Sequence, residues 1–154
     1  MGIALTLQSY FGDHHVAYEV TRHARTGNSS GTAEACHVPG ERLAKGVVLK
    51  SATGYILAVL PASKRIAIEA VEKVTGAPVM LASEQEASML FPDCETGAVP
   101  VFAEAYGIPA VIDEELADAE DVYCEGGDHM SLVHMKGREF RELMSGAERA
   151  HFVA

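Results

Sequence analysis

Apolar residues fall into short runs along the chain, and two of these runs lie close together. Residues 47–49 and 55–60 are rich in branched and aromatic side chains, and the residues 51–54 between them end in Gly54. This pattern predicts two strands joined by a tight turn. The second run hardly alternates between apolar and polar positions, so we expect protein to cover both faces of its strand.

The rest of the pattern predicts further short elements. Strands are expected at residues 16–20, 79–81, 110–112, 122–124 and 132–135. Helices are expected at residues 3–11, 33–36, 64–75, 84–91 and 138–144, with loops at 26–31 and 92–100. Ser63 is expected to cap the third helix and Gly76 to end it. Ser83 and Glu86 have the spacing of a capping box for the fourth.

This mixture of elements predicts an α/β (α+β) fold. Some strand pairs must be antiparallel, because a parallel crossover needs about a dozen residues and most connections are shorter. The length of 154 residues fits a single domain spanning 1–154. No apolar run approaches the ~20 residues that cross a bilayer, and the first residues do not form a secretory signal. We therefore expect a cytoplasmic protein without membrane contact, with its cysteines reduced.

The net charge is -10, which argues against general affinity for nucleic acid because the phosphate backbone would be repelled. The charge is unevenly distributed: residues 1–77 carry +2 and residues 78–154 carry -12. An anionic ligand is thus expected to approach the N-terminal half. Charge alone is equally compatible with an acidic C-terminal half that only keeps the protein in solution.

Seven histidines invite the interpretation of a metal site, but their spacing does not favour one. His14 and His15 are adjacent, while His129 and His134 have the wrong spacing for one face of a strand. The sequence also lacks a G-x-S-x-G elbow, and its cysteines have no cationic sequence neighbour. We expect no metal and no organic cofactor.

Three features are candidates for binding or catalysis. Lys45 precedes the first central strand, where it either extends toward water or faces an anion. The loop at residues 96–101 contains Gly97 and Pro100; it is either an ordinary turn or a set of backbone donors for a carbonyl or oxyanion. Residues 126–129 form either a hairpin turn or a second wall of a pocket.

Taken together, these motifs closely resemble the YbaK-like family, the editing domains associated with prolyl-tRNA synthetase, which include free-standing trans-editing proteins. The resemblance covers residues 23–144. It rests on the segments Lys45 to Lys50, 55–63, Gly97 to Pro100, Ile108-Pro109 with Asp113, and Gly126 to His129. Each motif is weak alone, and the set is specific.

The resemblance implies a mixed, partly barrel-like sheet flanked by helices. It also implies hydrolysis of the ester that joins a wrong amino acid to the terminal adenosine of tRNA, with the tRNA acceptor end, and in some members a synthetase, as partner. The matching catalytic positions are Lys45 and Gly97. The positions implied to bind substrate are His23, Thr32, Ala98, Val99, Gly126 and His129.

One departure from the family concerns the proline that closes the Gly-x-x-x-Pro loop. It is expected at position 101, where this chain has Val101, and the chain's own proline is Pro100. Two functions follow from the same motifs. The first is a deacylase that acts in trans on tRNA carrying a small amino acid; the second is a non-catalytic module that binds an aminoacyl or nucleotide ligand.

Overall fold

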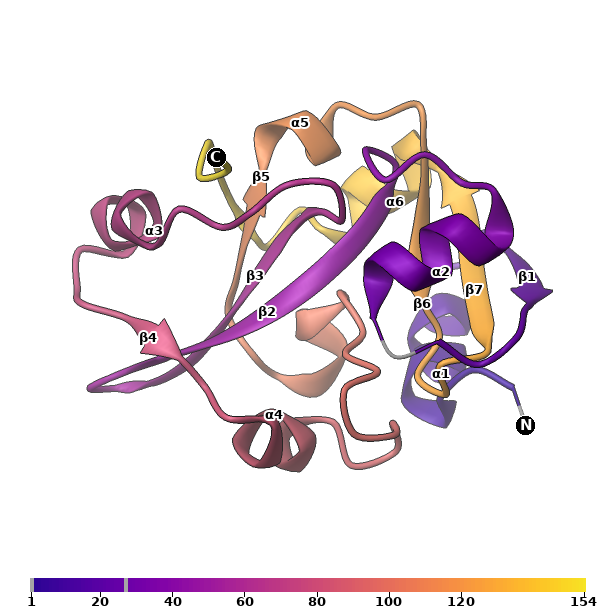
Figure 1. Cartoon of the computed structure of the whole chain (residues 1–154), viewed down its shortest axis with the longest axis horizontal. Coiled ribbons are helices and arrows are strands. Elements are labelled where there is room, and N and C mark those ends of the chain that lie inside the picture. The colour runs from indigo at the N-terminus through magenta and orange to yellow at the C-terminus, as the bar shows by residue number, and fades with distance from the viewer. Residues whose placement is uncertain (1, 27) are drawn as a thin grey trace.

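The computed structural model describes residues 2–26 and 28–154, and Gly27 of the expected loop lies outside them. Within the described residues eight strands form one mixed sheet, in the order β1-β7-β6-β2-β3-β5-β8, with β4 paired to β2 (Figure 1). The strands are β1 (Glu19–Arg22), β2 (Leu43–Ser51), β3 (Gly54–Pro61), β4 (Met80–Leu81), β5 (Ala110–Asp113), β6 (Asp121–Glu125), β7 (Ser131–Lys136) and β8 (Glu148–Ala150). The expected α/β class is confirmed.

The long hairpin of β2 and β3 crosses the middle of the molecule (Figure 1). Its strands are antiparallel, and the turn between them ends at Gly54, as the apolar pattern predicted. β2 begins four residues earlier than expected, so Lys45 lies inside the strand and pairs with Leu60. The pairs β2–β6, β3–β5 and β5–β8 are parallel.

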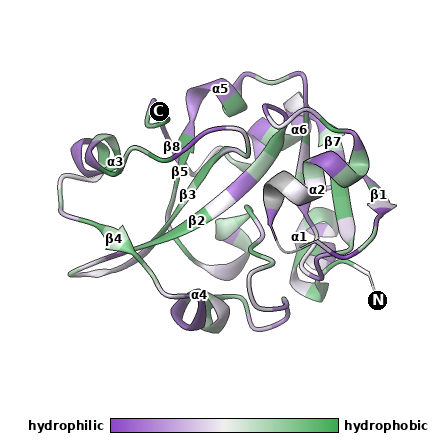
Figure 2. Ribbon diagram, viewed as in Figure 1, coloured by the Kyte–Doolittle hydropathy of each residue, from purple (hydrophilic) through white to green (hydrophobic). Residues whose placement is uncertain are grey.

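Apolar clusters cover both faces of this hairpin, as expected for β3. Ala44, Val48 and Leu57 pack in the larger cluster, which contains Phe102 and Phe140. On the other face, the second cluster contains the following buried residues: Leu49, Ala58, Leu60, Val71, Val111 and Phe152. Figure 2 shows the same strands as largely hydrophobic along their length. The sheet is therefore held between two apolar layers, which fixes the backbone of β2 and β3.

Six α-helices and one 3₁₀ helix surround the sheet in the described residues. They are α1 (Leu5–Asp13), α2 (Ser29–Cys36), α3 (Ile68–Thr75), α4 (Glu84–Leu90), α5 (Glu114–Ala117), α6 (Gly137–Leu143) and the 3₁₀ helix η1 (Ala103–Tyr106). In Figure 1, α2 lies in front of β6 and β7, and its Ala33 and Cys36 pack against Leu43 and Leu132. None of these helices has the length and apolar character needed to cross a bilayer.

Two expected elements are placed differently. The strand expected at 16–20 begins only at Glu19, and all four residues of β1 are exposed because β1 is an edge strand paired with β7 alone. The third helix begins at Ile68 with Ala67 as its N-cap, so the prediction that Ser63 caps it is wrong. Ile66 instead forms a β-bridge with Val153. Gly76 ends this helix in a left-handed conformation, as predicted.

The predicted capping box at the start of α4 is present: Ser83 accepts from the N–H of Glu86, and Glu86 accepts from the N–H of Ser83. The same carboxylate binds Lys50 Nζ and the Tyr55 hydroxyl, each at 2.8 Å. The hydrogen bond from Lys50, followed by those from Ser83 and Tyr55, lowers the pKa of Glu86 to about 2. One side chain therefore joins α4 to the β2–β3 hairpin.

This anchor predicts an acid-dependent loosening of α4. The pKa of Glu86 is lower in the fold than its ordinary value of 4.5, so its contribution is complete above about pH 4.5 and is lost as the pH falls toward 2. An NMR titration should show the Glu86 carboxyl ionised at pH 3, when exposed glutamates are largely protonated. A midpoint near 4.5 for Glu86 would contradict the anchor.

Candidate functional site

A small cavity of about 50 Å³ opens between α2, β2 and two loops. It is lined by Asn28, Thr32, Leu43, Ala44, Gly46, Gly97, Val99, Glu125 and His129. Four of the residues predicted to form the site are in this set, namely Thr32, Gly97, Val99 and His129. Segments that are about a hundred residues apart in the sequence thus meet at one cavity.

Gly46 allows the loop before Val101 to lie directly on β2. A Cβ at position 46 would approach Leu57 Cδ1 to 3.0 Å, Val99 Cγ1 to 3.2 Å and the Pro100 carbonyl oxygen to 3.3 Å. Larger residues at position 46 would therefore push this loop outward. Val101, which stands where the family has proline, is fully buried in the larger core cluster.

The loop at residues 95–99 is built on a tight turn. The N–H of Ala98 donates to the carbonyl oxygen of Glu95 at 2.9 Å, and Gly97 has φ +85° at the third position of that turn, as a type II turn requires. The prediction that Ala98 offers an outward N–H is therefore wrong. In the described part of the chain, the N–H groups of Gly97 and Val99 form no hydrogen bond.

Glu125 organises the loop that carries His129. Its Oε2 atom accepts from the N–H groups of Gly127 at 2.8 Å, Asp128 at 3.2 Å and His129 at 3.2 Å. His129 has φ +61°, an unusual backbone conformation for a residue with a side chain. The three hydrogen bonds to Glu125 Oε2 hold the backbone of residues 127–129 in this conformation.

The ring of His129 joins the two loops. Its Nε2 atom lies 2.8 Å from the carbonyl oxygen of Thr96, which can only accept, so Nε2 carries a proton. In the neutral ring, Nδ1 is then an acceptor. A second tie is the hydrogen bond from the N–H of Glu95 to the carbonyl oxygen of Gly127, at 2.8 Å. The turn at Gly97 and the loop at His129 are thus held against each other.

Hydrogen bonds also hold Thr32, which lines the cavity, and Asp128, which directly precedes His129. Burial opposes ionisation of Asp128, but hydrogen bonds from Met130 and Ser131 hold its pKa below the usual value. The hydroxyl of Thr32 donates to the carbonyl oxygen of Asn28 at 3.1 Å and also contacts the hydroxyl of Thr26. Asn28 in turn caps α2 by accepting from Gly31 at 2.7 Å.

Lys45 does not line the cavity, because alternate residues of a strand point to opposite faces and Lys45 lies between the lining residues Ala44 and Gly46. Its Nζ atom makes one long contact, 3.5 Å, with the carbonyl oxygen of Ala62. Burial, and then the nearby charge of Arg65, lower the pKa of Lys45. Among the described residues no carboxylate pairs with Lys45, so the positive charges of Lys45 and the nearby Arg65 are not offset there by an ion pair with Lys45.

His23 and Gly126 also lie outside the cavity lining. The Nδ1 atom of His23 is 2.7 Å from the carbonyl oxygen of Ala24, and its Nε2 atom is buried without a partner among the described residues. The N–H of Gly126 donates to Ser131 and its carbonyl accepts from Ala4, both at 2.9 Å. A Cβ there would come within 2.7 Å of Ile3, so the close packing of this glycine explains its place in the motif.

The sequence prediction missed several lining residues, and Glu125 is the most important of them. A carboxylate directly before Gly126-Gly127 is a signal that could have been used, because it can accept from the free N–H groups of the glycine turn. No comparable sequence feature marks the other missed lining residues, which are Asn28, Leu43, Ala44 and Gly46. They reach the cavity only because α2 and β2 pack there.

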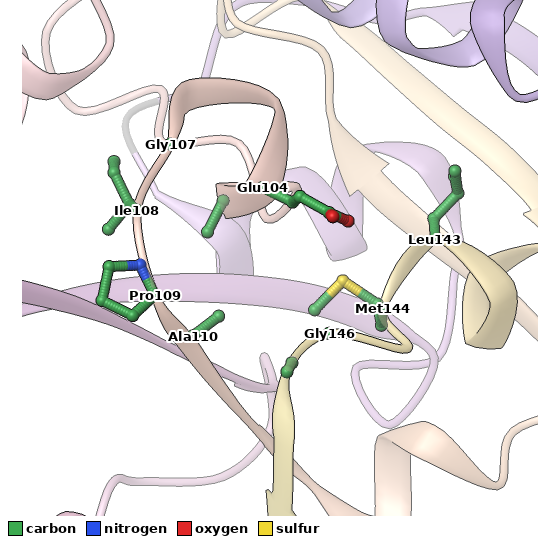
Figure 3. A pocket seen from close by; sticks show the side chains of 10 residues that line it. Glu104, Gly107, Ile108, Pro109, Ala110, Leu143, Met144 and Gly146 are labelled. Carbon is green, nitrogen blue, oxygen red and sulfur yellow. The ribbon is translucent and has the colours of Figure 1, made fainter.

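A second, larger cavity of about 260 Å³ lies between η1 and the end of α6. Figure 3 shows residues 107–110 on one side of it and Leu143, Met144 and Gly146 on the other. Its one charged group is Glu104, whose carboxylate accepts from the Tyr10 hydroxyl at 2.8 Å. None of the predicted site residues lines this apolar cavity, so it is not the candidate site.

Among the described residues, one group has the spacing to hold a metal ion: Asp113, Glu115 and His151, whose ligand atoms lie within 4.8 Å of one another. Asp113 is fully buried, and its two oxygens accept from the N–H groups of Glu115 at 3.0 Å and Phe152 at 2.9 Å. These bonds give Asp113 a structural role, since they fix the start of α5 against the C-terminal segment.

The comparisons with known proteins concern the family and the fold of the chain. A family model described as the aminoacyl-tRNA editing domain matches residues 23–143. A solved structure of a protein described only as hypothetical has a TM-score of 0.85 at 22% identity, covering 97% of this chain and 99% of the other.

Another solved structure, described as a candidate trans-editing enzyme for prolyl-tRNA synthetase, has a TM-score of 0.81 at 21% identity and covers 97% and 95% of the two chains. None of the curated protein sequences matches the chain. At these identities the structures establish the fold, whereas the family match extends over most of the sequence. The chain therefore belongs to the aminoacyl-tRNA editing domain family.

Proposed function

We propose that the protein is an aminoacyl-tRNA deacylase that acts in trans and hydrolyses the ester of a mischarged tRNA. The observation that carries this proposal is the turn at Gly97: Gly97 and Val99 line the cavity, and their N–H groups form no hydrogen bond in the described chain. Two such donors can stabilise the negative charge that develops on an ester oxygen during attack by water.

In this mechanism the cavity supplies positioning and charge stabilisation. The ester carbonyl lies against the turn at Gly97, and water attacks it with a proton acceptor nearby, either Nδ1 of His129 or the free ribose hydroxyl of the substrate. Lys45, on the other face of β2, binds the anionic tRNA end outside the cavity. No residue lining the cavity offers a serine or cysteine nucleophile.

The size of the cavity supports a small amino acid as the acyl group. At about 50 Å³ the cavity is much smaller than the roughly 300–1,000 Å³ of pockets that hold drug-sized ligands, which favours an acyl group with a small side chain. Alanine, serine and cysteine have such side chains. Gly46 also affects the size of the cavity, because a larger residue at position 46 would contact Val99.

The acidic surface favours a small contact with tRNA. With a net charge of -10, the protein would repel most of the phosphate backbone, so we propose that it touches only the acceptor end or receives tRNA from a synthetase. Lys45 and its neighbour Arg65 are the cations best placed for that contact. This function belongs in the cytoplasm, where aminoacyl-tRNA is used.

A deacylation panel tests the proposal. Purified protein is incubated with tRNAs charged with alanine, serine, cysteine and larger residues, and each rate is compared with the uncatalysed rate. We expect acceleration for at least one small residue and none for the large ones. We also expect EDTA to leave the rate unchanged, since the catalytic groups named here need no metal.

A lack of acceleration on every tRNA would remove the deacylase function. Binding of the charged tRNA without turnover would instead favour a module that senses an aminoacyl ligand. Loss of activity on EDTA treatment, with recovery on addition of zinc, would point to a metal-dependent reaction.

A further inference from the structure

We propose that Arg25 is a positioning residue that holds together the two loops of the deacylation site, an inference that rests on the proposed function. Its guanidinium forms an ion pair with Glu95 through Nη2. Its Nη1 atom donates to the carbonyl oxygen of Asp128 at 3.5 Å. Glu95 begins the turn that contains Gly97, and Asp128 directly precedes His129. One side chain thus reaches both walls of the cavity.

Arg25 also brings a third segment to these loops. The next residue, Thr26, donates its N–H to the carbonyl oxygen of His129 at 3.4 Å, and its hydroxyl contacts Thr32 in α2. The segment before α2, the turn at Gly97 and the loop at His129 therefore meet around Arg25. Among the residues that the structure describes, two hydrogen bonds join the two loops directly, from Glu95 to Gly127 and between His129 and Thr96.

The charges around Arg25 favour a role within these loops over a role as a free cation for RNA, because its guanidinium is paired with Glu95. Glu95 pairs with it directly, and the charges of Asp128 and Glu125 act on it in the same direction, so all three raise the pKa of Arg25. Arg25 in turn lowers the pKa of Glu95, so the pair is ionised at neutral pH. This changes the expectation that basic residues of the N-terminal half all attract an anion, because the charge of Arg25 is already matched.

A guanidinium is suited to this bridge because its planar fork directs separate N–H groups to two acceptors, whereas an ammonium is a point charge on a flexible chain. The consequence is kinetic. The N–H groups of Gly97 and Val99 must face the ester while His129 stands opposite, and small displacements of catalytic groups lower rates strongly. Substrate binding through Lys45 does not depend on this bridge.

The first test separates a bridge from a simple positive charge. Arg25→Ala and Arg25→Lys are assayed on the best substrate of the panel, with Arg149→Ala and Arg149→Lys as matched controls. Arg149 also forms an exposed ion pair, with Asp118, away from the cavity. We expect both Arg25 variants to lose about tenfold in kcat with KM changed less than twofold, and both Arg149 variants to match the parent.

An Arg25→Lys protein with the parent kcat would overturn the proposal, because charge alone would then suffice. Glu95→Gln removes the Glu95 half of the bridge and should also lower kcat, and the double variant should be no slower than Arg25→Ala, since Arg25→Ala already removes both contacts. Additive losses would also overturn it.

The second test needs no substrate, so it stays decisive even if the panel shows no deacylation. Amide hydrogen exchange is measured at residues 96–99 and 126–129 in the parent, Arg25→Ala and Arg149→Ala. We expect faster exchange in both segments for Arg25→Ala only. Unchanged exchange would overturn the bridge whatever the rates, whereas faster exchange in a protein that hydrolyses no ester would reject only the proposed function.

Discussion

Replacing Gly97 with valine is expected to remove deacylation while the protein stays folded. Gly97 has φ +85°, a conformation that costs a residue with a side chain about 1–2 kcal/mol and costs a β-branched residue most. A Cβ at this position would find ordinary contacts, 3.5 Å to His129 Cε1 and 3.7 Å to Glu84 Oε1. The backbone angle, more than lack of space, makes the turn dependent on glycine.

A valine at position 97 would relieve its strain by turning the peptide, and this moves the N–H groups of Gly97 and Val99 away from the ester. Loss of one oxyanion donor typically costs ~10²–10³ in rate, so the effect on kcat should lie far outside error. Single-turnover deacylation, together with circular dichroism, measures it.

Gly76 provides the matched control for this substitution. It has φ +75° at the end of α3, with nothing within 4 Å of an added Cβ, and it does not line the cavity. Gly76→Val should lose stability to a similar extent and keep the parent rate. If Gly97→Val also kept the parent rate, the loop would be only a turn, and the binding-module function would become the better one.

Lys45→Ala is expected to lower kcat/KM for charged tRNA at least tenfold without unfolding the protein. The ammonium is partly buried, has no carboxylate partner among the described residues, and lies near Arg65, so burial and a like charge both lower its pKa. A phosphate bound here would favour the charged ammonium and so offset both the burial and the repulsion from Arg65. Lys45→Ala would therefore remove the attraction for phosphate, whereas it would break no ion pair among the described residues.

Salt dependence separates Lys45 from the catalytic groups. If Lys45 contacts a phosphate, the variant should show a weaker dependence of tRNA binding on salt, by about one unit in the log–log slope. Lys73, an exposed lysine in α3, is the control, and Lys73→Ala should change neither rate nor slope. An unchanged rate for Lys45→Ala, with an unchanged circular dichroism spectrum, would exclude this lysine from the site.

Features encoded by neighbouring residues were predictable from the sequence. The β2–β3 hairpin and the capping box of Ser83 and Glu86 depend on local spacing, and both are confirmed. Ser63 was misleading because the chain after it is drawn into a bridge between Ile66 and Val153, a partner far away in sequence. β8 was missed because its three residues are largely exposed and carry no apolar pattern.

The sequence predicted which motifs contribute to the candidate site, but not how their atoms are arranged in it. Gly97 and His129 both stand in glycine-containing loops, and the cavity includes both. Which N–H groups are free was not predictable, since the bond from Ala98 to Glu95 depends on the turn type. The direction of Lys45 also required the true start of β2, because a strand alternates its faces.

The last strand has a consequence for how the chain folds during synthesis. β8 covers the outer edge of β5, and Phe152 supplies an N–H to Asp113 and a carbonyl oxygen to the N–H of Ala67 at 2.7 Å. A chain made from its N-terminus therefore has β2, β3 and the site loops available while the β5 edge is still unpaired. Open strand edges recruit other chains, so the nascent protein is most prone to aggregate in the interval before residues 148–152 emerge.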